Sequence, residues 1–247
     1  MAHILGIDVG GSGIKAALVD TLSGELVSER HRVATPRPST PANMAAAIRE
    51  LVGTFDYHVI VGCCFPTIIM HGVAKSASNL GEAWRNMPVD ATFSDATGLP
   101  FVAINDADAA AMAEMQMGAG RGLDGLVLTL TVGTGIGSGL FYDGVLVPNI
   151  EAGHMPGKDG RPIESYASDR ARKLDKLDWR EWGERFNYML GRVVRVFSPD
   201  DIILGGGVSK KYDKYSDAID VDARIHIAKF RNDAGIIGAA LEAGSHA

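Results

Sequence analysis

Short apolar runs that end in glycine or polar residues recur along the chain, and this pattern predicts buried strands. Four such runs are HILGIDVGG (3–11), HVIVGCCFP (58–66), GLPFVAIND (98–106) and DIILGGGVS (201–209). IKAALVD (14–20) predicts a strand that pairs antiparallel with the first run. GLVLTLTVGTGIGSGLFYDG (125–144) predicts strand, glycine turn and strand, followed by a type I′ turn at Asp143-Gly144.

Apolar residues at helical spacing predict four helices between these strands. Their segments are ANMAAAIRELVGTF (42–55), ADAAAMAEMQMGAG (107–120), LDWREWGERFNYMLGRVVRVF (177–197) and NDAGIIGAALEAG (232–244). In the third segment Trp182, Phe186, Met189, Val193 and Val196 form the predicted core stripe. TPRPSTP (35–41) contains three prolines and predicts a loop.

Two glycine turns resemble each other, one in each half of the chain. Gly11-Ser12-Gly13-Ile14 and Gly133-Thr134-Gly135-Ile136 each follow an apolar strand. This match predicts a duplicated α/β architecture of two lobes with a ligand-binding cleft. We expect a small lobe over residues 1–110, completed by a C-terminal helix at about 233–247, and a large lobe over 111–232.

Composition narrows the function classes. The chain is 46% hydrophobic with a net charge of −6, which is typical of a globular protein and gives no basic face for nucleic acid. No apolar window is long enough to span a membrane, and no signal peptide is recognisable. Cys63 and Cys64 are adjacent, and no Cys-x-x-Cys pair suggests zinc. We therefore expect a cytoplasmic protein with two buried, reduced thiols.

Three glycine-rich turns are candidate phosphate sites, because glycine lets the backbone N–H groups approach an anion closely. The first follows Asp8, a candidate Mg²⁺ ligand, and precedes Lys15, which is either a phosphate ligand or a solvated residue. In the second, Thr134 and Ser138 offer hydroxyl groups to phosphate. The third is Gly205-Gly206-Gly207. The alternatives are ordinary hairpins, a bulge or a turn that leads into a helix.

Two further sets of polar residues are candidates for sugar chemistry. Asn105-Asp106 lies where a strand meets a helix, so Asp106 is a candidate general base and Asn105 a candidate partner of a sugar hydroxyl. The alternative is that both only cap the helix. Glu151, His154 and Glu164 lie in a Gly/Pro-containing stretch and suit directional hydrogen bonds to sugar hydroxyls. The alternative for His154 is a structural or surface histidine.

Taken together, these motifs resemble the ROK family of sugar kinases. The resemblance rests on GIDVGGSGIKAALVD, INDADAAA, LTVGTGIGSGL, NIEAGH and ILGGGVS in the family's order. TPRPSTP, SNLGEAWRN and LVPNIEAGH are similar to the branch of the family that uses polyphosphate. The resemblance implies an α/β, actin-like ATPase (ribonuclease H-like) fold, a homodimer, and Mg²⁺-assisted phosphoryl transfer from polyphosphate or ATP to the 6-hydroxyl of glucose.

The resemblance also implies roles for individual residues. Asp106 matches the catalytic base. The sugar contacts match Asn79, Asn105, Glu151, His154 and Glu164. The phosphate turns match Asp8, Gly10, Gly11, Ser12 and Gly13, then Thr134, Gly135 and Gly137, then Gly206 and Gly207. No cysteine follows His154, so we expect no zinc and interpret this histidine as a sugar contact.

Some positions depart from the family pattern, and other functions stay open. The stretch from His154 to Glu164, HMPGKDGRPIE, and Thr67 after Phe65-Pro66 differ from the usual sequences beside the sugar site. Residues 158–180 and 205–232 are each net positive, which suits a polyanionic donor or else a solvated surface. The alternatives are a strictly ATP-dependent hexokinase for glucose, mannose or another sugar, and a non-catalytic sugar sensor. A repressor of this family needs a helical DNA-binding module, which we do not expect here.

Overall fold

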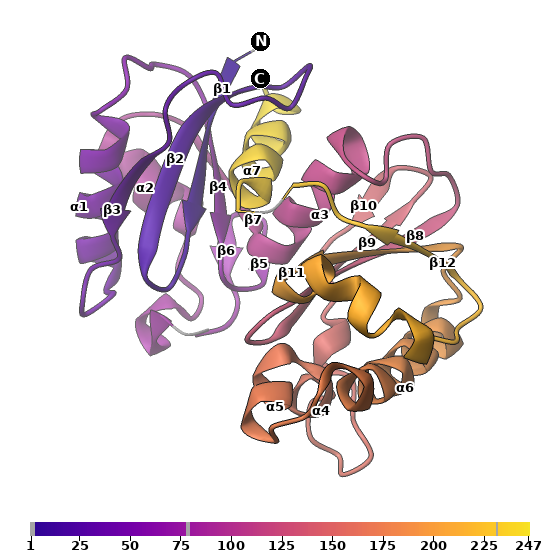
Figure 1. Ribbon diagram of the computed structural model, residues 1–247. Helices are drawn as coiled ribbons and strands as arrows, with labels where there is room; N and C mark the ends of the chain where they lie inside the picture. The colour runs from indigo at the N-terminus through magenta and orange to yellow at the C-terminus, as the bar shows by residue number, and fades with distance from the viewer. Residues whose placement is uncertain (1–2, 78–79, 231) are drawn as a thin grey trace. The chain divides into compact units, whose positions relative to one another are not determined.

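The computed structural model describes residues 3–77, 80–230 and 232–247. The chain divides into two compact units, of which the first contains Met1–Ala113 and Asn232–Ala247 and the second Glu114–Arg231. The boundary between them falls within helix α3 (Asp106–Met117). Each unit has its own sheet and its own core (Figure 1).

Within the described residues, the sheet of the first unit has five strands in the order β3-β2-β1-β4-β7. These strands are β1 (His3–Val9), β2 (Gly13–Asp20), β3 (His31–Ala34), β4 (Val61–Phe65) and β7 (Phe101–Asn105). β1, β2 and β3 pair antiparallel, whereas β4 pairs parallel with both β1 and β7. The other elements are a small hairpin of β5 (Ile69–Met70) and β6 (Val73–Ala74), a 3-10 helix (Glu82–Trp84), α1 (Pro41–Val52), α2 (Val89–Thr97) and α7 (Ala234–Gly244).

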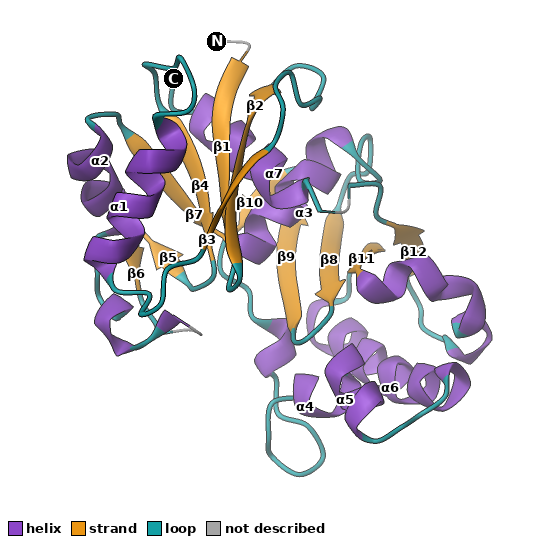
Figure 2. Cartoon of the chain, turned by 60° about the vertical axis from the view of Figure 1, so that its left-hand side comes forward, coloured by secondary structure: helices purple, strands orange, loops and turns teal. Residues whose placement is uncertain are grey.

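Helices cover both faces of this first sheet (Figure 2). Side chains alternate along β1, so Leu5 and Ile7 join the core beneath α1 and α2. Gly6, on the other face, lies against the backbone of Ile236 in α7. Because glycine has no Cβ, α7 can pack closely on this face, and the sheet is buried between two helical layers.

The sheet of the second unit repeats this topology in the described part of the chain, in the order β10-β9-β8-β11-β12. Its strands are β8 (Leu126–Val132), β9 (Ile136–Tyr142), β10 (Val145–Val147), β11 (Asp201–Gly206) and β12 (Arg224–Ile227). β8, β9 and β10 pair antiparallel, and β11 pairs parallel with β8 and β12. The helices are α4 (Glu164–Ala167), α5 (Asp169–Leu174), α6 (Trp179–Phe197) and 3-10 helices at Ala152–His154, Gly207–Lys214 and Ser216–Ala218.

Helix α6 supplies much of the second core. Trp182, Phe186, Met189 and Val193 are fully buried, as the periodicity predicts. The prediction that Val196 belongs to the same buried stripe is wrong, because its side chain is 60% exposed. In the last turn of α6, before the left-handed Ser198, Val194 and Phe197 pack against the core instead.

The duplicated architecture predicted from the glycine turns is confirmed by the matching strand orders. The type I′ turn is also confirmed, because Asp143 and Gly144 both have positive φ, at 48° and 78°. Both cysteines are buried and unbridged. Among the described residues, no helix is long and apolar enough to cross a membrane.

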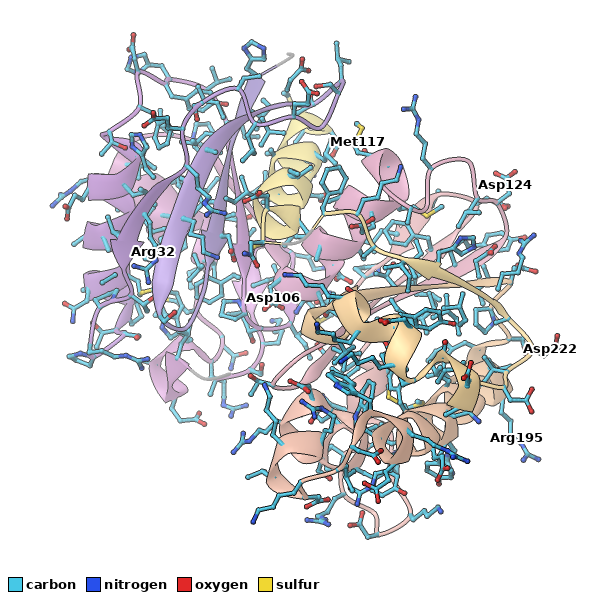
Figure 3. All side chains as sticks on the ribbon, viewed as in Figure 1. Arg32, Asp106, Met117, Asp124, Arg195 and Asp222 are labelled. Atoms are coloured by element: carbon cyan, nitrogen blue, oxygen red, sulfur yellow. The ribbon has the colours of Figure 1, made fainter. Side chains whose placement is uncertain are left out.

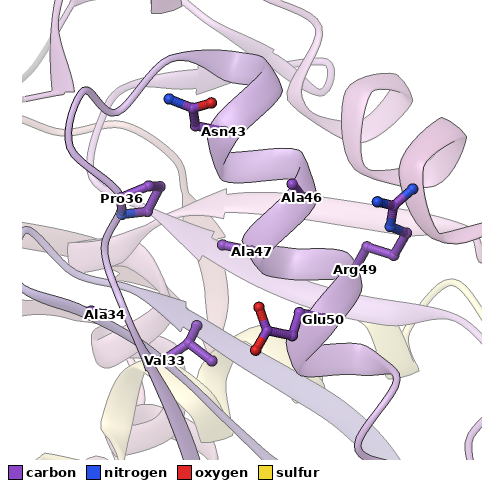
Figure 4. Close-up of a pocket in the computed structure, with 8 residues that line it drawn as sticks. All are labelled: Val33, Ala34, Pro36, Asn43, Ala46, Ala47, Arg49 and Glu50. Carbon is purple, nitrogen blue, oxygen red and sulfur yellow. The ribbon is translucent and has the colours of Figure 1, made fainter.

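An open groove of about 710 Å³ lies between β3 and α1 in the first unit (Figure 4). Its lining includes Val33, Pro36, Ala47 and Arg49. None of the described candidate site residues lines this groove, so it has no part in the site that follows.

Candidate functional site

In the first unit, the candidate residues lie at the carboxyl ends of parallel strands. Asp8 near the end of β1 is level with Cys64 in β4, and Asn105 at the end of β7 is level with Phe65. Parallel strands place their carboxyl ends at one edge of the sheet, which is where open α/β sheets bind ligands. The sheet therefore gathers Asp8, Asn105 and Asp106 at the edge where the first glycine hairpin turns.

Asp8 is held by two neighbours. Lys15, directly opposite in the β1–β2 register, places its Nζ 2.9 Å from Asp8 Oδ2. The thiol of Cys64 donates to Asp8 Oδ1 at 3.4 Å. Burial raises the pKa of Cys64 well above its ordinary value, and the Asp8 and Asp106 carboxylates raise it further, so the thiol stays protonated and can donate. Lys15 is thus paired with Asp8 rather than solvated.

The first glycine hairpin is closed by a hydrogen bond from Gly10 N–H to Gly13 O of 3.1 Å. Two arginines that the sequence analysis did not select also reach it. Arg32 donates to Ser12 O at 2.9 Å, and Arg37 donates to Gly11 O at 2.8 Å. The sheet order, which places β3 beside β2, brings them there, and no local motif carries that information.

Asn105 caps helix α3. Its side-chain oxygen accepts hydrogen bonds from Ala107 N–H at 2.8 Å and Asp108 N–H at 3.1 Å. Its amide nitrogen donates to Thr67 O at 3.0 Å, which leaves one amide N–H for another partner. Asp106 is the first residue of the helix and is exposed, so its carboxylate lies at the positive end of the helix dipole. Figure 3 labels Asp106 and Met117 at the two ends of α3.

In the second unit, three predicted sugar-binding residues lie together. His154 Nδ1 is 3.7 Å from Glu151 Oε2, and His154 Nε2 is 4.0 Å from Glu164 Oε1. All three side chains are partly exposed, so their polar atoms remain accessible to a ligand. Burial raises the pKa of Glu151, whereas His154 opposes that shift.

Glu164 also joins this cluster to the second glycine hairpin. Its Oε2 accepts the Ile136 N–H at 2.9 Å, directly after the turn in which Gly133 N–H donates to Gly135 O at 2.9 Å. Gly137 follows in β9. One carboxylate therefore faces the histidine through one oxygen and holds the hairpin through the other.

The predicted role of Ser138 as a phosphate ligand is wrong. Its side chain is 2% exposed, its hydroxyl donates to Ile150 O, and it accepts from Ala152 N–H at 2.9 Å. Because strand residues alternate, Ser138 faces the interior and fastens the segment that carries Glu151. Thr134, at the tip of the hairpin, is exposed.

The third glycine turn lies beside the second. Gly206 at the end of β11 is level with Val132 at the end of β8, immediately before Gly133. Gly206 has a φ of 78°, and a Cβ at this position would collide with the Val132 backbone, so only glycine fits. Gly207, which follows, is exposed and begins a 3-10 helix. Asn79, another predicted sugar contact, lies outside the described residues.

Comparison with known proteins gives consistent results. The ROK family model matches residues 4–171. Polyphosphate glucokinase of Mycobacterium tuberculosis is 37% identical over 240 residues, which are 97% of this chain and 90% of the relative.

Two solved structures are similar over nearly their whole length. An inorganic polyphosphate/ATP-glucomannokinase from Arthrobacter sp. strain KM is 43% identical, with a TM-score of 0.91 and 100% of both chains covered. A ROK family glucokinase from Streptomyces griseus, solved in complex with glucose and AMPPNP, is 25% identical with a TM-score of 0.82. The match covers 98% of this chain and 99% of that one.

Proposed function

The chain belongs to the ROK family, and on this premise we propose that it transfers a phosphoryl group from polyphosphate or ATP to the 6-hydroxyl of glucose. It is a sugar kinase with the α/β actin-like ATPase fold. The observation that carries the proposal is the double engagement of Glu164, which faces His154 at 4.0 Å and holds the second glycine hairpin at 2.9 Å. This contact ties a cluster suited to sugar hydroxyls to a turn suited to phosphate.

We propose that Asp106 is the general base of the reaction. Its carboxylate accepts the proton of the 6-hydroxyl as that oxygen attacks the phosphorus, and the bond to the leaving phosphate breaks. The dipole of α3 favours the ionised form of a carboxylate at this position. Asn105, Glu151, His154 and Glu164 bind the sugar, and the bond to Thr67 uses only one of the two amide N–H donors of Asn105.

The donor phosphates bind to the backbone N–H groups of the three glycine turns. The contacts we propose are Asp8, Gly10, Gly11, Ser12, Gly13 and Lys15 for the first turn, Thr134, Gly135 and Gly137 for the second, and Gly206 and Gly207 for the third. Turns of this kind hold anions without a basic surface, which suits a chain whose net charge is −6. Phosphoryl transfer depends mainly on positioning and electrostatic stabilisation, which fixed backbone donors provide.

We propose that Mg²⁺ accompanies the donor and that Asp8 holds it directly or through water. Among residues 3–77, 80–230 and 232–247, no group of three or more His, Cys, Asp or Glu side chains forms a metal cage. This fits Mg²⁺, which proteins usually bind through one or two carboxylates together with substrate phosphates. When bound, the ion neutralises charge on the phosphate oxygens.

The proposed compartment and oligomeric state of the enzyme follow from its two thiols and from the family, respectively. We propose that it works in the cytoplasm, where Cys63 and Cys64 stay reduced, and that two copies form a homodimer. Light scattering of the purified protein tests the homodimer, which a monomeric mass at assay concentration contradicts.

A matrix of donors and acceptors tests the proposed reaction. Glucose and mannose are each incubated with ATP or with long-chain polyphosphate in the presence of Mg²⁺, and sugar 6-phosphate is measured. We expect product from glucose with either donor. Product with ATP alone would contradict polyphosphate as a donor, and no product from any pair would favour a sugar-binding protein without catalytic activity.

A further inference from the structure

Two guanidinium groups lie on the first glycine hairpin. Arg32, in β3 and labelled in Figure 3, and Arg37, in the loop before α1, donate to the adjacent carbonyl groups of Ser12 and Gly11 at 2.9 and 2.8 Å. A Cβ on Gly13 would lie only 2.5 Å from two nitrogen atoms of Arg32. Glycine at this position therefore leaves the space that the Arg32 guanidinium occupies.

Arg32 and Arg37 are both positively charged and exposed to solvent. In the described part of the chain, neither forms an ion pair with a carboxylate. Arg30, two residues before Arg32, differs because it pairs with Asp233 at 2.5 Å. Each guanidinium has five N–H donors and spends one on the hairpin carbonyl, so most of its donors remain available.

We propose that Arg32 and Arg37 form an anion subsite that binds phosphate groups of the polyphosphate donor beyond the group that is transferred. This inference rests on the proposed function, in which the same hairpin binds donor phosphate. The planar guanidinium matches phosphate oxygens in a two-pronged geometry, and two neighbouring cations favour a ligand with repeated negative charges. Because the hairpin carbonyls already orient both groups, less side-chain entropy is lost when the chain of phosphates binds.

Kinetics with donors of different length test the subsite. The variants are Arg32→Gln, Arg37→Gln and the double variant, since glutamine keeps an amide donor for the carbonyl but removes the charge. We expect kcat/KM for long-chain polyphosphate to fall roughly fivefold for each arginine removed, relative to kcat/KM for ATP or tripolyphosphate. The remaining activity with long chains should also depend less on ionic strength.

Arg195→Gln is the matched control. Arg195 is exposed near the end of α6 in the second unit and has no ion pair among the described residues. It lies shortly before the amino end of β11, whereas the glycine turn follows the carboxyl end of that strand. This variant loses the same charge and should keep the donor ratio of the wild type. Equal losses with long-chain polyphosphate and ATP in the Arg32 and Arg37 variants would show that they only brace the hairpin, and would overturn the inference.

Binding without turnover separates this inference from the proposed function. Calorimetry measures the affinity of long-chain polyphosphate in the absence of sugar. A folded double variant that binds as tightly as Arg195→Gln would contradict the subsite, even if the wild type phosphorylates glucose from polyphosphate. A wild type that binds polyphosphate but forms no product would contradict the proposed donor, while the arginine comparison would still decide the subsite. If the wild type binds no polyphosphate, the subsite and the use of polyphosphate as donor are both wrong, and glucose phosphorylation from ATP then tests the rest of the proposed function.

Discussion

Asp106 differs from its neighbours because it combines exposure with a fixed backbone position. The cap made by Asn105 fixes the first turn of α3, and Asp106 is the first residue of that turn. Asp106→Asn removes the proposed proton acceptor but keeps a group of the same shape that can still hydrogen-bond to the sugar. We expect kcat to fall by about 10²–10⁴-fold, with little change in glucose affinity. A coupled assay measures kcat, and calorimetry measures glucose binding.

The matched control for this substitution is Asp222→Asn. Asp222 is exposed and lies before β12 (Figure 3), away from the glycine turns in sequence and outside the candidate site. The Asp222→Asn variant loses the same charge as Asp106→Asn and should retain the full turnover of the wild type. Near-normal turnover of Asp106→Asn, with circular dichroism unchanged from the wild type, would refute the role of Asp106 as the base.

At the residue level, the sequence suggested candidate residue types, but it could not predict what each side chain contacts. From the sequence, Asn105 could either cap the helix or contact the sugar, and the structure shows that it makes the cap. Ser138 looked like a phosphate ligand because it follows a glycine turn, but its strand face points inward. Arg37 and Cys64 gained partners at Gly11 and Asp8 only through strand order, which no local pattern encodes.

At the scale of elements, strong periodicity made the longest helix predictable. α6 begins with a capping box in which Asp178 and Glu181 each bond the other's backbone, a signal visible in the sequence as Asp-x-x-Glu. Several elements were missed, among them α2 and β12. α2 is rich in Thr, Ser and Asp, which favour helices weakly, and β12 is a short edge strand with the sequence RIHI. Tertiary packing, rather than local preference, makes these two segments regular.

The edge strand β12 is attached to β11 through a buried carboxylate. Asp201, whose side chain is fully buried, accepts two hydrogen bonds from Arg224, at 2.8 and 2.7 Å, and lies 2.7 Å from His226 Nε2. Burial acts to raise the pKa of Asp201, but the bonds from Arg224 and His226 outweigh it and hold that pKa below its ordinary value. Asp201→Asn should lower the free energy of unfolding at pH 7 by about 1–3 kcal/mol. The effect is no larger because Arg224 is largely exposed, so that water screens its charge.

The sign of the pH dependence follows from the lowered pKa of Asp201. Its contribution to stability is present above the pKa of the unfolded state, about 3.9, and is lost as the pH falls through the lower pKa of the folded state. The difference between wild type and Asp201→Asn should therefore persist at about pH 5 and shrink below about pH 4. Urea unfolding at several pH values measures it, with the exposed Asp213→Asn as control. A difference that persists unchanged at pH 3 would contradict the charged pairing.

At the scale of the whole molecule, the chain joins the two units twice. One connection runs through α3 after Ala113, and the other precedes Asn232. Repeated glycine turns made two similar sheets predictable, whereas nothing in the sequence pattern indicated what holds the connections. The structure shows a carboxylate in that role. Glu114 is 2% exposed, and it accepts backbone hydrogen bonds from Ala119 and Lys229 at 3.0 Å and from Phe230 at 2.5 Å.

Glu114 thus fastens both connections within the second unit, and replacing it should loosen the segment around Lys229. Glu114→Gln leaves one acceptor oxygen where two served three N–H groups, so at least one partly buried backbone donor loses its partner. We expect about 2–3 kcal/mol of destabilisation and faster hydrogen exchange at Ala119, Lys229 and Phe230. The control is Glu50→Gln, which replaces an exposed glutamate of α1. The hydrogen-exchange rates of β1 and β4 in Glu114→Gln should differ from those of the wild type no more than they do in this control. Unchanged protection of residues 229–230 would show that other contacts hold this connection, because a donor that keeps its protection after losing its acceptor was not secured by it.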